Sequence, residues 1–235
     1  MIEIKKGNIF TTDCQTIVNT INCVGIMGAG IAFEFKLRYP EMFKKYQLFC
    51  DNNLINIGNL WIYKLPKEKN NSYISILNFP TKKHWKYPSK EEYLKKGLQK
   101  FIDTYKKKGI KSIAFPLLGS NKGGITEAQS LEIMQHYLQQ VDIPVEIWFF
   151  DPTAKDDLYE EFKYLFLSLD NDLIQKESKL RIDFINKIKI ALQRKDINSI
   201  SALLRVKGIG ETSLKKSFLF IQNFNTHTSN NLFTV

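Results

Sequence analysis

The sequence predicts an α/β protein with three layers, in which helices cover both faces of a central mixed, mostly parallel sheet. Segments of strand character alternate with segments of helical periodicity up to residue 150, which is typical of this class. Two glycine-rich loops, at 25–30 and 119–124, directly follow strands. A change in composition after residue 170 predicts a small all-α C-terminal region. We therefore expect a domain over 1–170, a basic helical region over 171–225 and a disordered tail over 226–235.

The expected strands are short and apolar. They cover residues 2–5, 16–19, 57–63, 73–77, 111–115 and 144–150. The strand at 73–77 runs into a polar and aromatic stretch, 78–85, in which Pro80 is central. Because proline cannot donate a ladder hydrogen bond, this stretch is expected to be a loop at the strand's carboxyl end.

Helices are expected between these strands and after the last one. They cover 31–49, where Pro40 starts a second piece, 89–108, 126–140 and 154–168. Ser89, with Glu92 three residues on, and Thr126 have the residue types of N-caps. The polar residues 171–178 are expected to be a linker, followed by an amphipathic helix over 181–195 and an apolar helix that ends near 224.

Charge and composition narrow the class of partner. The formal net charge is +10, from 34 Lys and Arg against 24 Asp and Glu, which favours a polyanion such as nucleic acid. The alternative is compositional drift, since Lys, Asn and Ile are abundant throughout. No apolar run reaches the ~20 residues of a membrane span, and the first residues lack a signal-peptide core. We expect no membrane association and a cytoplasmic location.

The cysteines and histidines give no sign of a metal or other cofactor. Cys14, Cys23 and Cys50 are odd in number and lack paired spacing, so they are expected to be reduced thiols. The glycine loops point to another kind of ligand, because glycine allows close approach and helix N-termini attract anions. A phosphate-bearing ligand is expected there, and tight turns without a ligand are the alternative.

Five segments, in this order, resemble the macrodomain family. They are 7–9, 18–22, 25–32, 78–85 and 116–124. More narrowly, they are similar to the branch that contains the DNA ADP-ribosyl glycohydrolase antitoxin DarG and the terminal ADP-ribose glycohydrolases of animals. The resemblance covers 1–152 and implies a cleft above the sheet that binds ADP-ribose.

The resemblance also implies which residues bind ADP-ribose. The turn after the first strand contacts adenine, Asn22 holds the distal ribose, and the two glycine loops bind the phosphates, the second one also wrapping the distal ribose. The implied set is Asn8, Ile9, Asn22, Gly28, Ala29, Gly30, Ile31, Gly119, Ser120, Asn121, Lys122, Gly123, Gly124 and Ile125. Phe150 and Asp151 lie where the adenine end is flanked.

Lys82 is the expected catalytic residue, because the lysine after Asn-Phe-Pro-Thr is catalytic in this branch. A neutral lysine amine can attack C1″ of the distal ribose and form a Schiff base that water releases. Such an amine needs a lowered pKa, from partial burial or from a neighbouring cation such as Lys83. Alternatively, Lys82 stabilises or protonates the leaving base, or is a solvated loop charge.

Other residues are candidates for supporting roles in the reaction. The animal enzymes have an Asp that resolves the lysyl adduct, whereas Gly123 stands at that position here. Glu127 is a candidate acid, with a first-turn residue favoured by the helix dipole as the alternative. His84 and Trp85 are candidates for stacking on the modified base, with loop anchoring as the alternative.

The C-terminal region carries a second motif. Residues 204–210 resemble a helix-hairpin-helix, in which Gly208 and Gly210 present backbone N–H groups to a DNA phosphate. Lys207 and Lys215 would add phosphate contacts. Contact with a protein partner and a plain helical turn are the alternatives.

The expected function is hydrolysis of the N-glycosidic bond that joins ADP-ribose to a DNA base. The expected partners are ADP-ribose and ADP-ribosylated DNA, with a cognate DNA ADP-ribosyltransferase toxin as a further one. One alternative is a module that binds ADP-ribose without turnover. Another is an antitoxin that neutralises the transferase by direct contact.

Overall fold

The computed structural model describes residues 1–66, 73–154 and 158–231. The chain forms two compact units, Met1–Ala154 and Lys155–Val235, so the division lies before the expected boundary at 170. The helix that follows Ala154 accounts for the difference, because it packs on later helices of the second unit.

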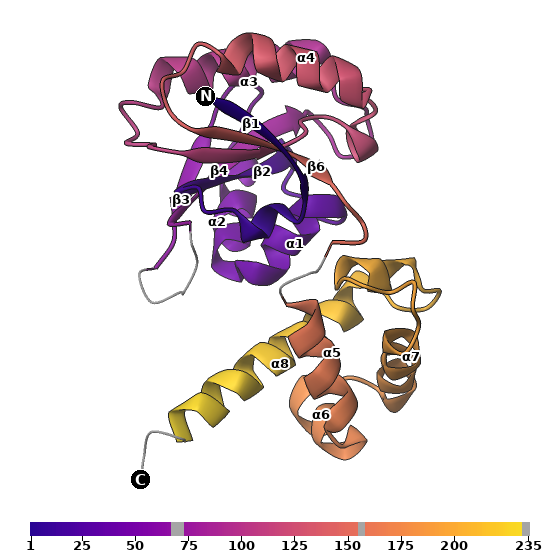
Figure 1. The fold of residues 1–235 in the computed structure, drawn as a ribbon. Coiled ribbons are helices and arrows are strands. Elements are labelled where there is room, and N and C mark those ends of the chain that lie inside the picture. Colours follow the sequence, from indigo (N-terminus) through magenta and orange to yellow (C-terminus); the bar gives the residue numbers. More distant parts are fainter. Residues whose placement is uncertain (67–72, 155–157, 232–235) are drawn as a thin grey trace. The chain divides into compact units, whose positions relative to one another are not determined.

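A six-stranded sheet is the centre of the first unit (Figure 1). Its strands are β1 (Ile2–Gly7), β2 (Thr16–Asn22), β3 (Trp61–Lys64), β4 (Ser75–Lys82), β5 (Ile113–Pro116) and β6 (Val145–Phe150). The order is β1-β6-β5-β2-β4-β3, and every pair is parallel except β3 with β4. The predicted three-layer α/β class is confirmed.

Helices cover both faces of this sheet, as Figure 1 shows. One face carries α1 (Gly30–Arg38) and α2 (Pro40–Asp51), and Pro40 is the first residue of α2 as predicted. The other face carries α3 (Glu91–Thr104) and α4 (Glu127–Leu138), which contact each other. Two short 3-10 helices, η1 (Ile9–Thr11) and η2 (Asn121–Gly123), follow β1 and β5.

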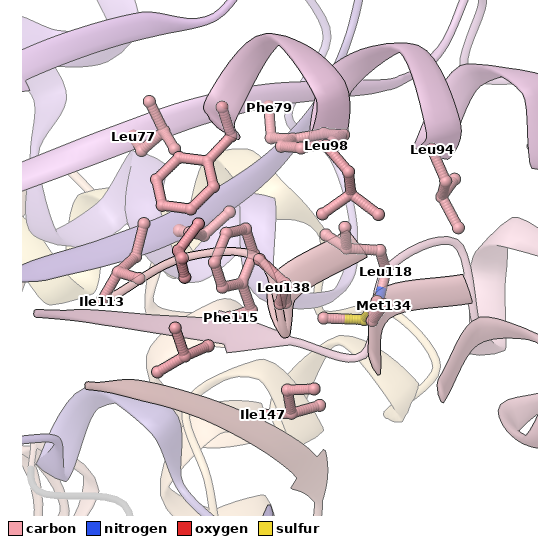
Figure 2. Packing of buried hydrophobic residues seen from close by; sticks show 14 of the residues in the cluster. Leu77, Phe79, Leu94, Leu98, Ile113, Phe115, Leu118, Met134, Leu138 and Ile147 are labelled. Atoms are coloured by element: carbon pink, nitrogen blue, oxygen red, sulfur yellow. The ribbon is translucent and has the colours of Figure 1, made fainter. Parts of the chain in front are cut away.

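The core beneath α3 and α4 is the larger hydrophobic cluster (Figure 2). Phe79 of β4, Phe115 of β5 and Leu98 of α3 are fully buried in it. Gly97 lets α3 lie directly on β4, because a Cβ at this position would be 2.2 Å from Cζ of Phe79. The opposite core, beneath α1 and α2, is rich in aromatic residues and includes Tyr46.

A buried carboxylate joins β1 to β6. Lys5 Nζ donates to Glu146 Oε1 at 2.6 Å, and Thr12 Oγ1 and Trp148 Nε1 donate to Oε2 at 2.5 and 2.8 Å. Burial alone would raise the pKa of Glu146, but these donors outweigh it and hold the pKa below its ordinary value. The carboxylate therefore stabilises this edge of the sheet in its charged form.

The stretch around Pro80 differs from the sequence prediction. β4 continues to Lys82 and includes Pro80, so the loop begins at Lys83. β3 pairs with β4 only as far as Asn78. Pro80 therefore lies beyond the end of the β3 ladder, so its missing N–H does not remove a hydrogen bond to β3.

The two predicted N-caps have different outcomes. Thr126 is the N-cap of α4, as predicted, and it forms a capping box with Gln129. Ser89 does not cap α3: the helix begins at Glu91, Lys90 is the N-cap, and Oγ of Ser89 is buried without a hydrogen-bond partner. The extended backbone at Lys90 moves the helix start past Ser89.

The second unit is helical. It contains α5 (Tyr159–Ser168), α6 (Asn171–Ser178), α7 (Ile182–Leu192), the 3-10 helix η3 (Ser201–Arg205) and α8 (Glu211–Asn231). The expected linker at 171–178 is wrong, because α6 forms there. Asp170 caps its N-terminus and Ile174 is fully buried. Of the expected disordered tail, 226–231 continue α8, and 232–235 lie outside the described residues.

Among the helices that the structure describes, none has the length and apolar character needed to cross a membrane.

Candidate active site

The loops that carry the candidate residues leave the sheet at one edge. β2, β4, β5 and β6 are parallel, so their carboxyl ends point the same way, and ligands on such sheets bind beyond these ends. Asn22 and Lys82 are the last residues of β2 and β4 and are register partners. The backbone N–H of Cys23 donates to the carbonyl of Lys83 at 3.3 Å. The first glycine loop and the segment after β4 therefore begin side by side.

Asn22 organises the first glycine loop from within. Its Oδ1 accepts from the N–H groups of Val24 and Ile26 at 3.0 and 3.3 Å, and its Nδ2 donates to the carbonyl of Ile26 at 2.5 Å. The hydroxyl of Tyr46 donates to the backbone oxygen and Oδ1 of Asn22 at 2.8 and 3.0 Å. Tyr46 is a support that the sequence did not reveal. The side chain of Asn22 shapes the loop, and ribose contact stays a prediction.

The loop ends in an open helix start. Gly28, Ala29 and Gly30 are exposed, and Ala29 is an extended N-cap of α1 without a side-chain hydrogen bond. Gly30 has φ +56° and open space where a Cβ would lie. The first N–H groups of a helix lack partners within the helix and attract anions. Ile31 packs on the aromatic core and anchors this helix start.

The second glycine loop is a tight turn with positive φ at several positions. Gly119 has φ +67° and no room for a side chain, since a Cβ would be 2.9 Å from Cδ1 of Ile125. Asn121 has φ +49° and Gly124 has φ +83°. The N–H of Gly123 donates to the carbonyl of Ser120 at 2.8 Å, and that of Ile125 to Gly119 at 3.0 Å. The loop is therefore a compact turn that is held by its own backbone hydrogen bonds between 119 and 125.

Lys82 reaches from the end of β4 to this second loop. Its side chain is half-buried, and Nζ donates to the backbone carbonyl of Lys122 at 2.5 Å. Burial, and then the charge of Lys122, lower the pKa of Lys82. Lys83 was the cation expected to lower this pKa, but its Nζ lies 5.9 Å from the ring centre of Tyr93 instead. The lowered pKa was predicted, but the cation responsible is Lys122.

Aromatic side chains follow Lys82 on the surface. The rings of His84 and Trp85 stack 5.6 Å apart, and Tyr87 lies 5.5 Å from His84. Trp85 is 51% and Tyr87 65% exposed, so both side chains have surface available to a planar partner. Tyr87 belongs to this group although the sequence analysis did not single it out.

The predicted adenine end lies where β1 and β6 finish. Asn8 caps η1, with Oδ1 accepting from the N–H of Phe10 at 3.1 Å, and Ile9 is buried. Phe150, the register partner of Gly7, is 56% exposed. An exposed ring therefore stands beside the turn that carries Asn8.

The remaining groups to consider are the Cys23 thiol, the Glu127 carboxylate and possible metal ligands. Burial raises the pKa of Cys23 to about 11, so this thiol is protonated at neutral pH and a poor nucleophile. Glu127 is an exposed first-turn residue of α4. Within the described ranges, no group of three or more His, Cys, Asp and Glu is placed to hold a metal ion.

The residues that were predicted to contact DNA phosphates all lie in the second unit. Gly208 has φ +90°, Gly210 precedes α8, and Lys207 is exposed. The residues before the turn form only the short η3, where a helix-hairpin-helix would have a longer first helix. Lys215 is partly buried on α8.

Known proteins match the first unit. Residues 18–134 match the Macro domain family. A DNA ADP-ribosyl glycohydrolase of Thermus aquaticus is 34% identical over 152 residues, which are 65% of this chain and 41% of that protein. The macrodomain of Mycobacterium tuberculosis DarG has a TM-score of 0.60 at 38% identity and covers 63% of this chain, with 97% of that structure matched.

A further relative is Thermosipho africanus DarTG in complex with ADP-ribose, with a TM-score of 0.58 at 33% identity over 62% of this chain and 40% of that one. The chain spans about two fifths of the length of the DNA ADP-ribosyl glycohydrolases it matches. Because a solved macrodomain is matched over nearly its whole length at 38% identity, the chain belongs to the macrodomain family and is related to DarG.

Proposed function

We propose that this protein hydrolyses the N-glycosidic bond between ADP-ribose and a DNA base, with Lys82 as the reacting group. One observation carries the proposal: a half-buried lysine amine with a lowered pKa stands at the end of β4, against the second glycine loop and beside Asn22 in register. The Thermus aquaticus relative is named for this activity.

The two glycine loops suit the diphosphate of ADP-ribose. One contributes the open N-terminus of α1 and the other a compact turn with positive φ at Gly119, Asn121 and Gly124, and backbone N–H groups at helix starts and in such turns bind phosphate oxygens. Phe150 and the turn with Asn8 and Ile9 would hold the adenine end. The structure of Thermosipho africanus DarTG contains ADP-ribose, which supports this assignment.

The chemistry follows from a neutral amine at Lys82. Nζ attacks C1″ of the distal ribose, the bond from C1″ to the base breaks, and the base takes a proton. Loss of a proton from nitrogen and opening of the ribose ring give a Schiff base. Water then adds to C1″, the lysine leaves, and ADP-ribose is released. The sum is one water consumed for each glycosidic bond cut.

The exposed rings after Lys82 would meet the modified base. Trp85 and Tyr87 are exposed, and stacking on an aromatic ring is worth about 1–3 kcal/mol per base. The exposed Lys86 lies 5.9 Å from the Trp85 ring centre and would face the phosphates of the same strand.

The test uses two adjacent lysines. Wild type, Lys82→Ala and Lys83→Ala are incubated with ADP-ribosylated DNA, and released ADP-ribose is measured together with ADP-ribose affinity. We expect Lys82→Ala to lower turnover at least ~10³-fold, as loss of a nucleophile does, and Lys83→Ala to keep it. If wild type binds ADP-ribose but releases none from DNA, the protein is a binding module and the hydrolase proposal fails.

The second unit is proposed to contact DNA phosphates through the Gly208–Gly210 turn and Lys207, without reading sequence. Its exposed lysine and positive-φ glycine support this use. A DNA ADP-ribosyltransferase is the proposed protein partner, from the likeness to DarG. Co-purification of the two proteins after joint expression tests that partnership, and separate elution would contradict it.

A further inference from the structure

Lys122 meets Lys82 through two different groups. Its backbone carbonyl accepts a hydrogen bond from Nζ of Lys82 at 2.5 Å. Its side chain is exposed, and its positive charge acts on the same amine. The first contact orients the Lys82 amine, and the second changes the balance between its charged and neutral forms.

The carbonyl of Lys122 is held in place by its neighbours. The preceding residue, Asn121, has φ +49°, which turns the peptide chain sharply. The carbonyl of the next residue, Gly123, accepts from the N–H of Ser89 at 2.8 Å, and a Cβ at Gly123 would be 2.9 Å from Oγ of Ser89. The second loop is therefore locked onto the segment that leads from Lys82 to α3.

The other side chains near Lys82 come from its own segment and from the β2 side. On its own segment, Lys83 extends to Tyr93 and His84 stacks on Trp85. From the β2 side come the neutral side chains of Asn22 and Cys23. Among the residues that the structure describes, Lys122 is the charged side chain that acts on Lys82, and no carboxylate opposes it.

We infer that Lys122 is a positioning residue for Lys82: its carbonyl orients the amine, and its ammonium group favours the uncharged, nucleophilic form. This inference rests on the proposed function of Lys82. It assigns Lys122 a task beyond contact with the ligand. Partial burial and a neighbouring positive charge both disfavour the charged form of the Lys82 amine. An amine that donates one N–H to a fixed carbonyl has its rotation restricted and its lone pair free for attack.

Bound ADP-ribose makes this task more important. Its diphosphate brings negative charge into the cleft, which favours a protonated Lys82. A second cation on the second glycine loop offsets that charge. Lys122 would therefore keep Lys82 reactive when the ligand is present.

The test separates the charge of Lys122 from its backbone carbonyl. Lys122→Met keeps the carbonyl and removes the charge, Lys122→Arg keeps both, and Lys83→Met removes a charge from the adjacent lysine. The rate of acetylation of Lys82 by acetic anhydride is measured against pH by mass spectrometry. This readout needs no turnover, so it stands even if the glycohydrolase proposal fails. The pH profile of ADP-ribose release from modified DNA is measured in parallel.

We expect Lys122→Met to move the acetylation profile of Lys82 to higher pH, because the neutral form becomes scarcer at each pH. At neutral pH, a shift of one pKa unit changes the fraction of neutral amine tenfold. We therefore expect labelling and kcat/KM to fall ~3–10-fold at neutral pH and to recover at alkaline pH. Lys122→Arg and Lys83→Met should keep the wild-type profile. An unchanged Lys82 profile in Lys122→Met would overturn the inference. So would weaker ADP-ribose binding without a shift in pH dependence, which would make Lys122 a ligand contact alone.

Discussion

The close packing of α3 on β4 at Gly97 allows a quantitative prediction. In Gly97→Ala, the new Cβ would lie 2.2 and 2.5 Å from two carbons of the Phe79 ring, whereas ordinary contact begins at 3.4 Å. Phe79 is fully buried, so the ring or the helix has to move. Overpacking costs about 1–3 kcal/mol, and Ala gains about 0.5–1 kcal/mol over Gly inside a helix. Because the overlap is deep, the overpacking cost is taken at its upper end, and about 3 kcal/mol less about 0.5–1 kcal/mol leaves a net loss of about 2 kcal/mol from the free energy of unfolding.

Tryptophan fluorescence measures this loss in the first unit alone. The three tryptophans of the chain, Trp61, Trp85 and Trp148, all precede residue 155, so the second unit does not contribute to the signal. The expected drop in melting temperature is roughly 4–8 °C, at 2–4 °C per kcal/mol.

Two comparisons make the Gly97 prediction sharp. Lys100→Ala, at an exposed position of the same helix, should change stability by less than ~0.5 kcal/mol. Combining Gly97→Ala with Phe79→Leu should cost less than the sum of the single changes, because the smaller side chain removes the clash. A Gly97→Ala protein as stable as wild type would refute the close approach of α3 to β4.

Three further predictions concern other parts of the molecule. Glu146→Gln should cost about 1–3 kcal/mol at neutral pH. The pKa of Glu146 is below its ordinary 4.5, so the stabilisation by its carboxylate is present above that pH and disappears on acidification. Denaturant unfolding at neutral pH and at a pH well below 4.5 should show that the cost of Glu146→Gln is smaller in acid. Tyr46→Phe should cost about 1–2 kcal/mol and weaken ADP-ribose binding by calorimetry, since Asn22 loses two hydrogen bonds; unchanged affinity would separate Tyr46 from the site. Lys207→Ala should reduce the slope of log affinity for DNA against log salt by ~1, and an unchanged slope would exclude this phosphate contact.

Local patterns were enough to predict the architecture of the first unit and the class of its loops. Short β-branched runs marked the strands, Pro40 marked the start of α2, and the glycine clusters marked the turns with positive φ. The motif that precedes Lys82 pointed to the carboxyl end of a strand, and Lys82 is the last residue of β4 rather than part of the expected loop. These features are local, because they depend on residues adjacent in sequence.

The features that the sequence did not reveal depend on partners far along the chain. Pro80 fits in β4 only because β3 stops pairing at Asn78. Ser89 has the composition of a cap, but its place against Gly123 draws it into the core. The cation that acts on Lys82 comes from residue 122, across the sheet, whereas sequence adjacency favoured Lys83. Spacing alone carries no information about such contacts.

The place of β1 in the sheet has a consequence for biosynthesis. β1 is an edge strand that pairs only with β6, joining Ile2 to Val145. During synthesis, residues 2–7 leave the ribosome before β6 and have no sheet partner until residues 145–150 have been made. The other strands can pair earlier with closer neighbours in sequence, and closure of so long a loop is entropically unfavourable. β1 is thus expected to pair later than the strands whose partners lie closer in sequence, and the charged Glu3, Lys5 and Lys6 disfavour wrong pairing at its edge until then.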